Sequence, residues 1–150
     1  MDVTDVKILE LLQENSRISI SEISKKVNMS LSAVSERLKK LESTDIIEKY
    51  TVILNPKYLG KELSVLMHLC FENSQEPDEF VHFLETEPEI LECHSITGDY
   101  DLSLKIVTRN TLTLEALMNR IKACPGITKT STNIILSSLK NNCSVAPHAD

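Results

Sequence analysis

"SISEISKKVNMSLSAVSERLKKL", residues 19–41, contains the start of one short helix, a turn, and the apolar stripe of a second helix. Ser19 and Glu22 are spaced as a capping box, in which each side chain accepts a hydrogen bond from the other residue's backbone N–H. Asn28 follows two turns later and tolerates the left-handed conformation that ends a helix. Ser30 is the N-cap predicted for the next helix. The stretch therefore predicts two helices joined by a three-residue turn.

The second of these helices has one apolar face and one polar face. Val34, Leu38 and Leu41 recur at helical spacing and form the stripe that we expect to be buried. A supporting helix is expected before the pair, at residues 5–13, with Thr4 as its N-cap. These are the elements of a helix-turn-helix, whose second helix places its N-terminal residues against base edges in the major groove.

The polar face supplies the residues expected to contact DNA. Serine side chains let a helix approach the bases closely, Glu36 can accept a hydrogen bond from cytosine, and Lys39 and Lys40 suit phosphates. Arg37 falls on the flank of this face, nearer the buried stripe. The alternative is a solvated helix face with no ligand, which the short capped helix, the turn and the clustered bases together disfavour. The candidate DNA-binding residues are Ser30, Ser32, Ser35, Glu36, Arg37, Lys39 and Lys40.

Charge divides the chain into two halves. The net charge is −6, yet residues 1–60 contain nine Lys/Arg and nine Asp/Glu, so the excess of acid lies in residues 61–150. Such asymmetry fits two modules with different partners. Between the modules, residues 50–54 predict a short strand that ends at Asn55-Pro56. This strand is either a linker between the modules or a wing of the first domain.

The second half alternates strands with helices. We expect strands at residues 63–71, 90–97, 102–107 and 127–136, with helices between Pro77 and Pro88 and at residues 112–121. The order βαββαβ is the ferredoxin-like arrangement, a four-stranded antiparallel sheet with both helices on one face. The fold class is therefore α+β, with an N-terminal helix-turn-helix followed by a ferredoxin-like βαββαβ domain.

The segment "TGDYD", residues 97–101, lies between the second and third strands. Gly98-Asp99 suits a two-residue hairpin turn, because glycine supplies positive φ, and a bare hairpin needs no ligand. The turn does not explain a tyrosine between two carboxylates, however. A bound amino acid would offer its ammonium group to these carboxylates and its own carboxylate to backbone N–H groups or hydroxyls. The candidate effector-binding residues are Gly98, Asp99, Tyr100, Asp101, Thr130 and Thr132.

Several strands carry apolar residues on both faces, although two helices can cover only one face. On the first strand, Leu66, His68 and Cys70 alternate with an apolar series. The uncovered face would be an exposed apolar patch, which usually marks a protein partner. Pairing of two copies through this face predicts a two-fold homodimer, and it would also bring two helix-turn-helix units together for two DNA half-sites.

The chain resembles the Lrp/AsnC family of transcriptional regulators over about residues 2–140. In the first module the resemblance rests on "DVKILELLQENSRISISEISKKVNMSLSAVSERLKKLESTDIIEKY", which is similar to the family's winged helix-turn-helix. In the second it rests on "ITGDYDLSLKI", which is similar to the family's Gly-Asp-Tyr/Phe-Asp hairpin. Asn28 and Asp45 stand where the family commonly has glycine, and both tolerate left-handed backbone.

The resemblance implies a sequence-specific DNA-binding regulator whose second domain senses a small molecule, usually an amino acid, at an interface between dimers. Family members form dimers through paired sheets and assemble further, often to octamers. The identity of the effector, the operator sequence and the direction of regulation do not carry over. The alternative is an amino-acid-sensing oligomer whose N-terminal module binds protein rather than DNA.

Other functional classes have little support in the sequence. The four cysteines are widely spaced and form no metal or disulfide pattern, so neither a metal nor a cofactor is expected. The four histidines lie apart and no nucleophile has a recognisable base partner, which argues against an enzyme. No apolar run is long enough to span a bilayer, and the acidic N-terminus lacks the features of a signal peptide, so a cytoplasmic location is expected.

These interpretations set the expected domain organisation. The last residues are polar and lack periodicity, which predicts a frayed tail. The expected parts are a DNA-binding domain at residues 1–50, a linker strand at 51–61, an effector-sensing and oligomerisation domain at 62–140, and a flexible tail at 141–150.

Overall fold

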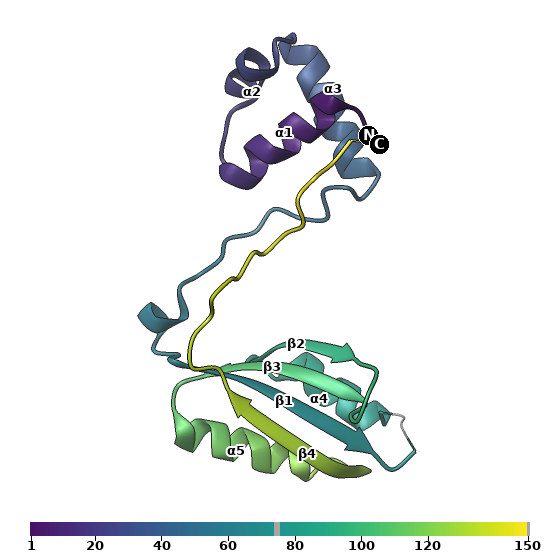
Figure 1. The fold of residues 1–150 in the computed structure, drawn as a ribbon, viewed down its shortest axis with the longest axis vertical. Helices are drawn as coiled ribbons and strands as arrows, with labels where there is room; N and C mark the ends of the chain where they lie inside the picture. The colour runs from purple at the N-terminus through teal and green to yellow at the C-terminus, as the bar shows by residue number, and fades with distance from the viewer. Residues whose placement is uncertain (74–75, 150) are drawn as a thin grey trace. The chain divides into compact units, whose positions relative to one another are not determined.

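The chain forms two compact units in the computed structural model, which describes residues 1–73 and 76–149 (Figure 1). Unit 1 contains Met1–Ile53 together with the C-terminal residues from Lys140 onward, and unit 2 contains Leu54–Leu139. Within the described residues, none of the helices has the length and apolar character needed to cross a membrane.

Three helices build unit 1: α1 (Val3–Glu14), α2 (Ile20–Val27) and α3 (Leu31–Ser43). The predicted N-cap of α1 is wrong, because Asp2 rather than Thr4 caps this helix. The Asp2 carboxylate accepts the Asp5 N–H at 2.8 Å, and the Asp5 carboxylate accepts the Asp2 N–H at 3.3 Å. This reciprocal pair leaves Thr4 inside the helix. The three helices bury one shared core, formed by Ile8, Ile23, Val34 and Leu41.

The predicted ends of α2 and α3 are confirmed. Glu22 donates its N–H to Ser19 Oγ at 3.2 Å and accepts the Ser19 N–H at 3.0 Å, which completes the capping box. Asn28 ends α2 with φ 54°, and Ser30 Oγ accepts the Ala33 N–H at 3.2 Å at the start of α3. Local hydrogen bonds therefore set the turn that joins the two helices.

The strand predicted at residues 50–54 is wrong. Within the described part of the chain this segment pairs with no other strand, and it has no regular secondary structure. Val52 and Ile53 remain 79% and 67% exposed. An apolar sequence pattern cannot make a strand unless a second segment supplies its backbone hydrogen bonds. A short 3₁₀ helix, η1 (Pro56–Leu59), follows and opens unit 2.

Unit 2 has the predicted βαββαβ order. Its elements are β1 (Leu63–Phe71), α4 (Asp78–Thr86), β2 (Ile90–Ser95), β3 (Leu102–Thr108), α5 (Thr111–Lys122) and β4 (Ile127–Ile134). The strands lie in the order β2-β3-β1-β4, and every neighbouring pair is antiparallel. The second and fourth strands are each two residues shorter at their C-terminal ends than the sequence predicted.

Both helices of unit 2 cover the same face of the sheet (Figure 1). Met67 and Leu69 of β1 are fully buried on this face, together with Phe80 of α4 and Leu117 of α5. We call the opposite side, which carries Leu66, His68 and Cys70 of β1, the open face. Side chains alternate along a strand, so register decides which residues reach the open face.

The C-terminal tail belongs to unit 1. Gln13, near the end of α1, donates its side-chain amide to Ser144 Oγ at 2.9 Å and to the Val145 carbonyl at 2.7 Å. The two chain termini are both marked beside this unit (Figure 1). The tail predicted to be frayed therefore has specific contacts, and unit 1 is built from both ends of the chain.

Candidate functional site

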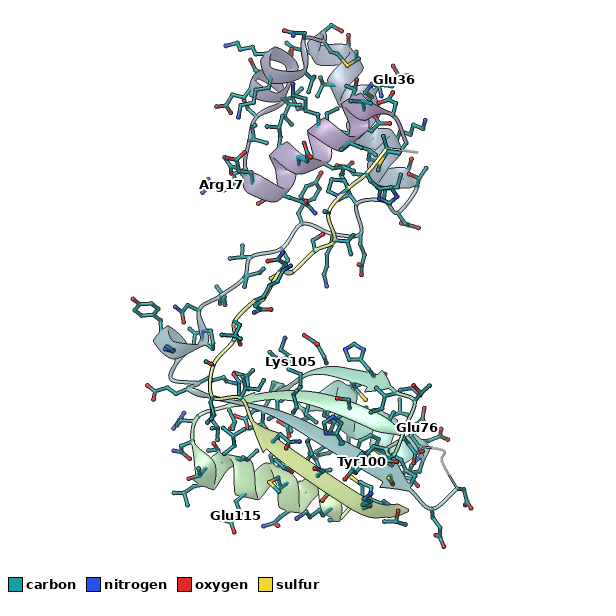
Figure 2. All side chains as sticks on the ribbon, viewed as in Figure 1. Arg17, Glu36, Glu76, Tyr100, Lys105 and Glu115 are labelled. Carbon is teal, nitrogen blue, oxygen red and sulfur yellow. The ribbon has the colours of Figure 1, made fainter. Side chains whose placement is uncertain are left out.

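The exposed face of α3 carries most of the predicted DNA-binding residues. Ser32, Glu36, Lys39 and Lys40 are exposed, and Ser35 is half-buried beside them. Glu36 is labelled in Figure 2, where it projects away from the helices of unit 1. A face of small polar side chains followed by two lysines suits close approach to bases and contact with phosphates. The structure therefore brings these five residues to one accessible surface.

The other two predicted DNA-binding residues have partners within the protein. Ser30 Oγ caps α3 and lies 3.1 Å from Ser32 Oγ. Arg37 turns toward the N-terminus of α1, where its Nη1 donates to Asp2 Oδ2 and to Asp5 Oδ1, both at 2.6 Å. The Arg37 side chain is 28% exposed and the Asp5 side chain 12% exposed. The guanidinium is thus held between two carboxylates of another helix.

These contacts change the acid–base properties of the residues involved. The Asp5 N–H and the Arg37 guanidinium hold the pKa of the Asp2 carboxyl below its ordinary value of 3.8. The same carboxylates raise the pKa of Arg37, with Asp2 the larger cause. Hydrogen bonds to an ionised carboxylate favour its charged form. The three residues consequently stay charged together at neutral pH.

The hairpin between β2 and β3 is larger than predicted. Ile96 donates its N–H to the Asp101 carbonyl at 2.9 Å, so residues 97–100 form a four-residue connection rather than a two-residue turn. Gly98 has φ +120°, a conformation that other residues rarely adopt, and no atom lies within 4 Å of the position that a Cβ would occupy. Backbone conformation, rather than crowding, therefore explains the glycine.

Asp101 anchors the hairpin to the end of β1. Its N–H donates to the Leu69 carbonyl at 2.9 Å, and its carboxylate accepts the Phe71 N–H at 2.8 Å. The Cys70 thiol adds a weak hydrogen bond to the Asp99 carbonyl at 3.3 Å. β1 has a register shift between Cys70 and Phe71, and Asp101 satisfies the backbone N–H at this irregularity. One of the two predicted effector-binding carboxylates is thus already engaged.

Tyr100, labelled in Figure 2, lies among side chains from β1 and β4. Its ring centroid is 5.5 Å from that of His68, and Lys129 Nζ lies 4.4 Å from the centre of the Tyr100 ring. A cation at this distance is attracted by the ring's negative face. We call Tyr100, His68 and Lys129 the aromatic–cation cluster. Within the described residues, Asp99 and Lys129 have no ion-pair partner.

The sequence analysis missed His68 and Lys129. Lys129 pairs with Cys70, so its side chain lies on the open face with that of His68. Thr130 and Thr132 pair with Leu69 and Met67, whose side chains are buried under the helices. Register therefore directs both threonines away from the cluster. The strand alternation around Cys70 contained this signal, but it could be used only once β1 was known to pair with β4.

The open face is mixed rather than uniformly apolar. Leu66 of β1 and Leu91 of β2 are 37% and 57% exposed. Beside them lies a polar group in which Lys105 donates to Glu92 at 2.7 Å and His94 lies 3.3 Å from the same carboxylate. The Lys105 contact holds the pKa of Glu92 below its ordinary value of 4.5. No group of three His, Cys, Asp or Glu among the described residues is arranged to hold a metal ion.

Comparison with known proteins assigns both units. A sequence model of a winged helix-turn-helix DNA-binding domain matches residues 1–48, and that of the Lrp/AsnC ligand binding domain matches residues 64–145. The chain belongs to the Lrp/AsnC family. This Lrp/AsnC chain is a transcriptional regulator with a DNA-binding domain and a ligand-binding domain, and not an enzyme.

Two relatives and one solved structure illustrate the match. The HTH-type transcriptional regulator FL11 of Pyrococcus horikoshii is 34% identical over 93% of this chain and 92% of that protein. The leucine-responsive regulatory protein of Escherichia coli is 34% identical over 95% and 88% respectively. The regulator NMB0573 of Neisseria meningitidis, solved with L-Met, superimposes with a TM-score of 0.88 at 26% identity, covering 97% of this chain and 96% of that one.

Proposed function

We propose that this regulator binds an amino acid beside the hairpin of residues 97–101 and couples that binding to its contact with double-stranded DNA. The matched ligand-binding domain includes the hairpin. The observation that carries the proposal is the pair of exposed, unpaired charges, Asp99 and Lys129, on either side of Tyr100. The L-Met complex of NMB0573 supports the choice of an amino acid.

The chemistry of the site matches a zwitterion. The Asp99 carboxylate can accept from an ammonium group, and the Lys129 ammonium can donate to a carboxylate. The Tyr100 ring offers apolar surface between them. Asp101 shapes the hairpin through Phe71, and Gly98 supplies its φ, so both act through the backbone. Thr130 and Thr132 leave the proposed contact set because register turns them to the helix-covered face.

Assembly completes the proposal. Two copies pair through their open faces, where Leu66 and Leu91 supply exposed apolar area, and the resulting homodimers assemble further to an octamer. The effector lies between dimers, so its binding changes the assembly and the spacing of paired α3 helices. Such coupling between two sites is typically about 1–3 kcal/mol. In this scheme residues 1–50 bind DNA, and residues 62–140 sense the effector and assemble, in the cytoplasm.

In unit 1, α3 enters the major groove. Ser32, Ser35 and Glu36 read base edges, and Lys39 and Lys40 contact phosphates, with Ser30 fixing the start of the helix. A gel-shift titration on DNA from upstream of the protein's own gene tests this contact. Lys39→Ala should weaken binding to most sequences and make its salt dependence shallower. An unchanged salt slope would remove Lys39 from the set of phosphate contacts.

A thermal-shift screen against the twenty amino acids tests the effector site. A true ligand at a hundredfold excess over its Kd stabilises the protein by about 2.7 kcal/mol. We expect Asp99→Asn and Lys129→Gln each to abolish the shift, and Lys122→Gln, which changes an exposed lysine on α5, to retain it. No stabilising amino acid, or full shifts in both hairpin variants, would reject the proposed site.

A further inference from the structure

We propose that Arg37 serves DNA binding as a positioning residue that fixes α3 against α1 through Asp2 and Asp5, and not as a phosphate contact. The proposal deepens the DNA-binding function and is independent of the effector site. It rests on the two 2.6 Å contacts from one guanidinium nitrogen to two carboxylates of the capping box that begins α1.

The location of these contacts makes a clamp between elements far apart in sequence. Arg37 lies in the middle of α3, and Asp2 and Asp5 are 35 and 32 residues away. Asp5 is among the few buried charged residues of the protein, with 8% relative exposure. A buried carboxylate needs a charged or hydrogen-bonding partner, and Arg37 is the basic side chain that reaches it. The pair therefore fixes how α3 is rotated and placed on the rest of unit 1.

The same geometry opposes a direct phosphate contact. A guanidinium bound to two carboxylates has its charge neutralised, and phosphate would have to displace both of them. Release of Arg37 would also leave two carboxylates beside α3, which would repel an approaching DNA backbone. Lys39 and Lys40 are exposed and lack carboxylate partners within the described residues, so they bear the phosphate contacts instead.

Removal of the Asp5 charge distinguishes the two roles, because they predict opposite signs. If Arg37 contacted phosphate, Asp5→Asn would free its guanidinium and remove a negative charge, and DNA binding would tighten. If Arg37 positions α3, Asp5→Asn breaks the clamp and specific binding weakens. Asparagine keeps a side-chain oxygen that can accept the Asp2 N–H, so the helix cap can survive the substitution. Glu10→Gln, which changes an exposed acid on α1, is the matched charge control.

The experiment uses the full chain, a duplex enriched from a random pool by the wild-type protein, and a scrambled duplex. Fluorescence anisotropy gives Kd for wild type, Asp5→Asn, Arg37→Gln, their double variant, Lys39→Gln and Glu10→Gln across a series of salt concentrations. Circular dichroism and thermal unfolding establish that each variant is folded at the assay temperature. If Arg37→Gln fails this check, the sign of the Asp5→Asn effect decides alone.

We expect Asp5→Asn and Arg37→Gln each to weaken binding to the enriched duplex by about three- to thirtyfold, with the double variant no weaker than the weaker single variant, as coupled residues require. Arg37→Gln should keep the wild-type salt slope, whereas Lys39→Gln should lose about 0.9 of it per phosphate contact. Binding to the scrambled duplex should change little in either clamp variant. Tighter or unchanged binding by Asp5→Asn, or a salt slope in Arg37→Gln reduced as in Lys39→Gln, would overturn the proposal. Loss of DNA binding by every protein including wild type would instead reject the DNA contact itself.

Discussion

Replacement of Asp101 by alanine should destabilise unit 2 through one lost hydrogen bond. The Asp101 carboxylate accepts the Phe71 N–H at 2.8 Å, next to the irregularity at the end of β1. The backbone contact from Asp101 N–H to the Leu69 carbonyl does not depend on the side chain and survives. Only the carboxylate contact is therefore removed, and the Phe71 N–H is left without an acceptor in a half-buried position.

The size of this effect follows from the kind of hydrogen bond. A hydrogen bond to a charged group contributes about 1.5–3 kcal/mol, and the half-buried site lets water satisfy part of the loss, which places the cost near 2 kcal/mol. A domain of this size loses about 4–8 °C of Tm for each kcal/mol, so the Tm should fall by roughly 8–16 °C. Asp101→Asn keeps an uncharged acceptor and should lose about half as much.

Differential scanning calorimetry of the full chain measures the change, with Asp99→Ala as the control. Asp99 is exposed and its carboxylate has no partner among the described residues, so its removal should change the free energy of unfolding by less than about 0.5 kcal/mol. Equal Tm values for Asp101→Ala and Asp99→Ala would refute the anchoring role. An effector response that weakens in Asp101→Ala while effector-free DNA binding persists would place the anchor upstream of ligand binding.

Three further predictions concern unit 1 and the cysteines. Asn28 has φ 54°, so Asn28→Gly should be neutral or stabilising, whereas Asn28→Val should cost at least about 1 kcal/mol in urea unfolding, and equal stability of the two variants would contradict the backbone argument. Because the folded-state pKa of Asp2 is below 3.8, its stabilising contribution is complete at neutral pH and is lost as the pH falls through the folded pKa. Thermal melts at decreasing pH should therefore show a lower neutral Tm and a smaller acid loss in Asp2→Asn than in wild type, and parallel curves would count against this contribution. Burial raises the pKa of the Cys93 and Cys124 thiols and Cys143 is exposed, so mass spectrometry after brief alkylation should find Cys143 labelled first; equal labelling of Cys93 would exclude the predicted difference.

The sequence predicted those features that depend on neighbouring residues. Ser19 and Glu22 are three residues apart and form their capping box within one turn, so the start of α2 could be located without any tertiary information. Alternation along β1 likewise separated the buried Met67 and Leu69 from His68. The βαββαβ order followed because each strand and helix carried its own periodicity.

Features that depend on a distant partner were missed or misplaced. Residues 50–54 have a strand-like pattern, but no segment of this chain pairs with them within the described residues. The position of Arg37 on the flank of α3 was predicted correctly, whereas its carboxylate partners on α1 could not be predicted from helical periodicity. Thr130 was chosen for its nearness to the start of β4, yet the pairing of that strand with β1 turns its side chain toward the helices. In each case a contact across more than thirty residues decided the outcome.

The return of the tail to α1 makes unit 2 an insertion within unit 1. The chain leaves unit 1 after Ile53 and re-enters it at Lys140, so two covalent junctions join the units. Any exchange of ligand-binding domains between relatives must therefore preserve both junctions, since a fusion cut only at Ile53 would separate Gln13 from Ser144 and Val145. A distortion of unit 2 reaches the DNA-binding helices through two strands of backbone, which gives the effector domain purchase on both ends of the same small unit.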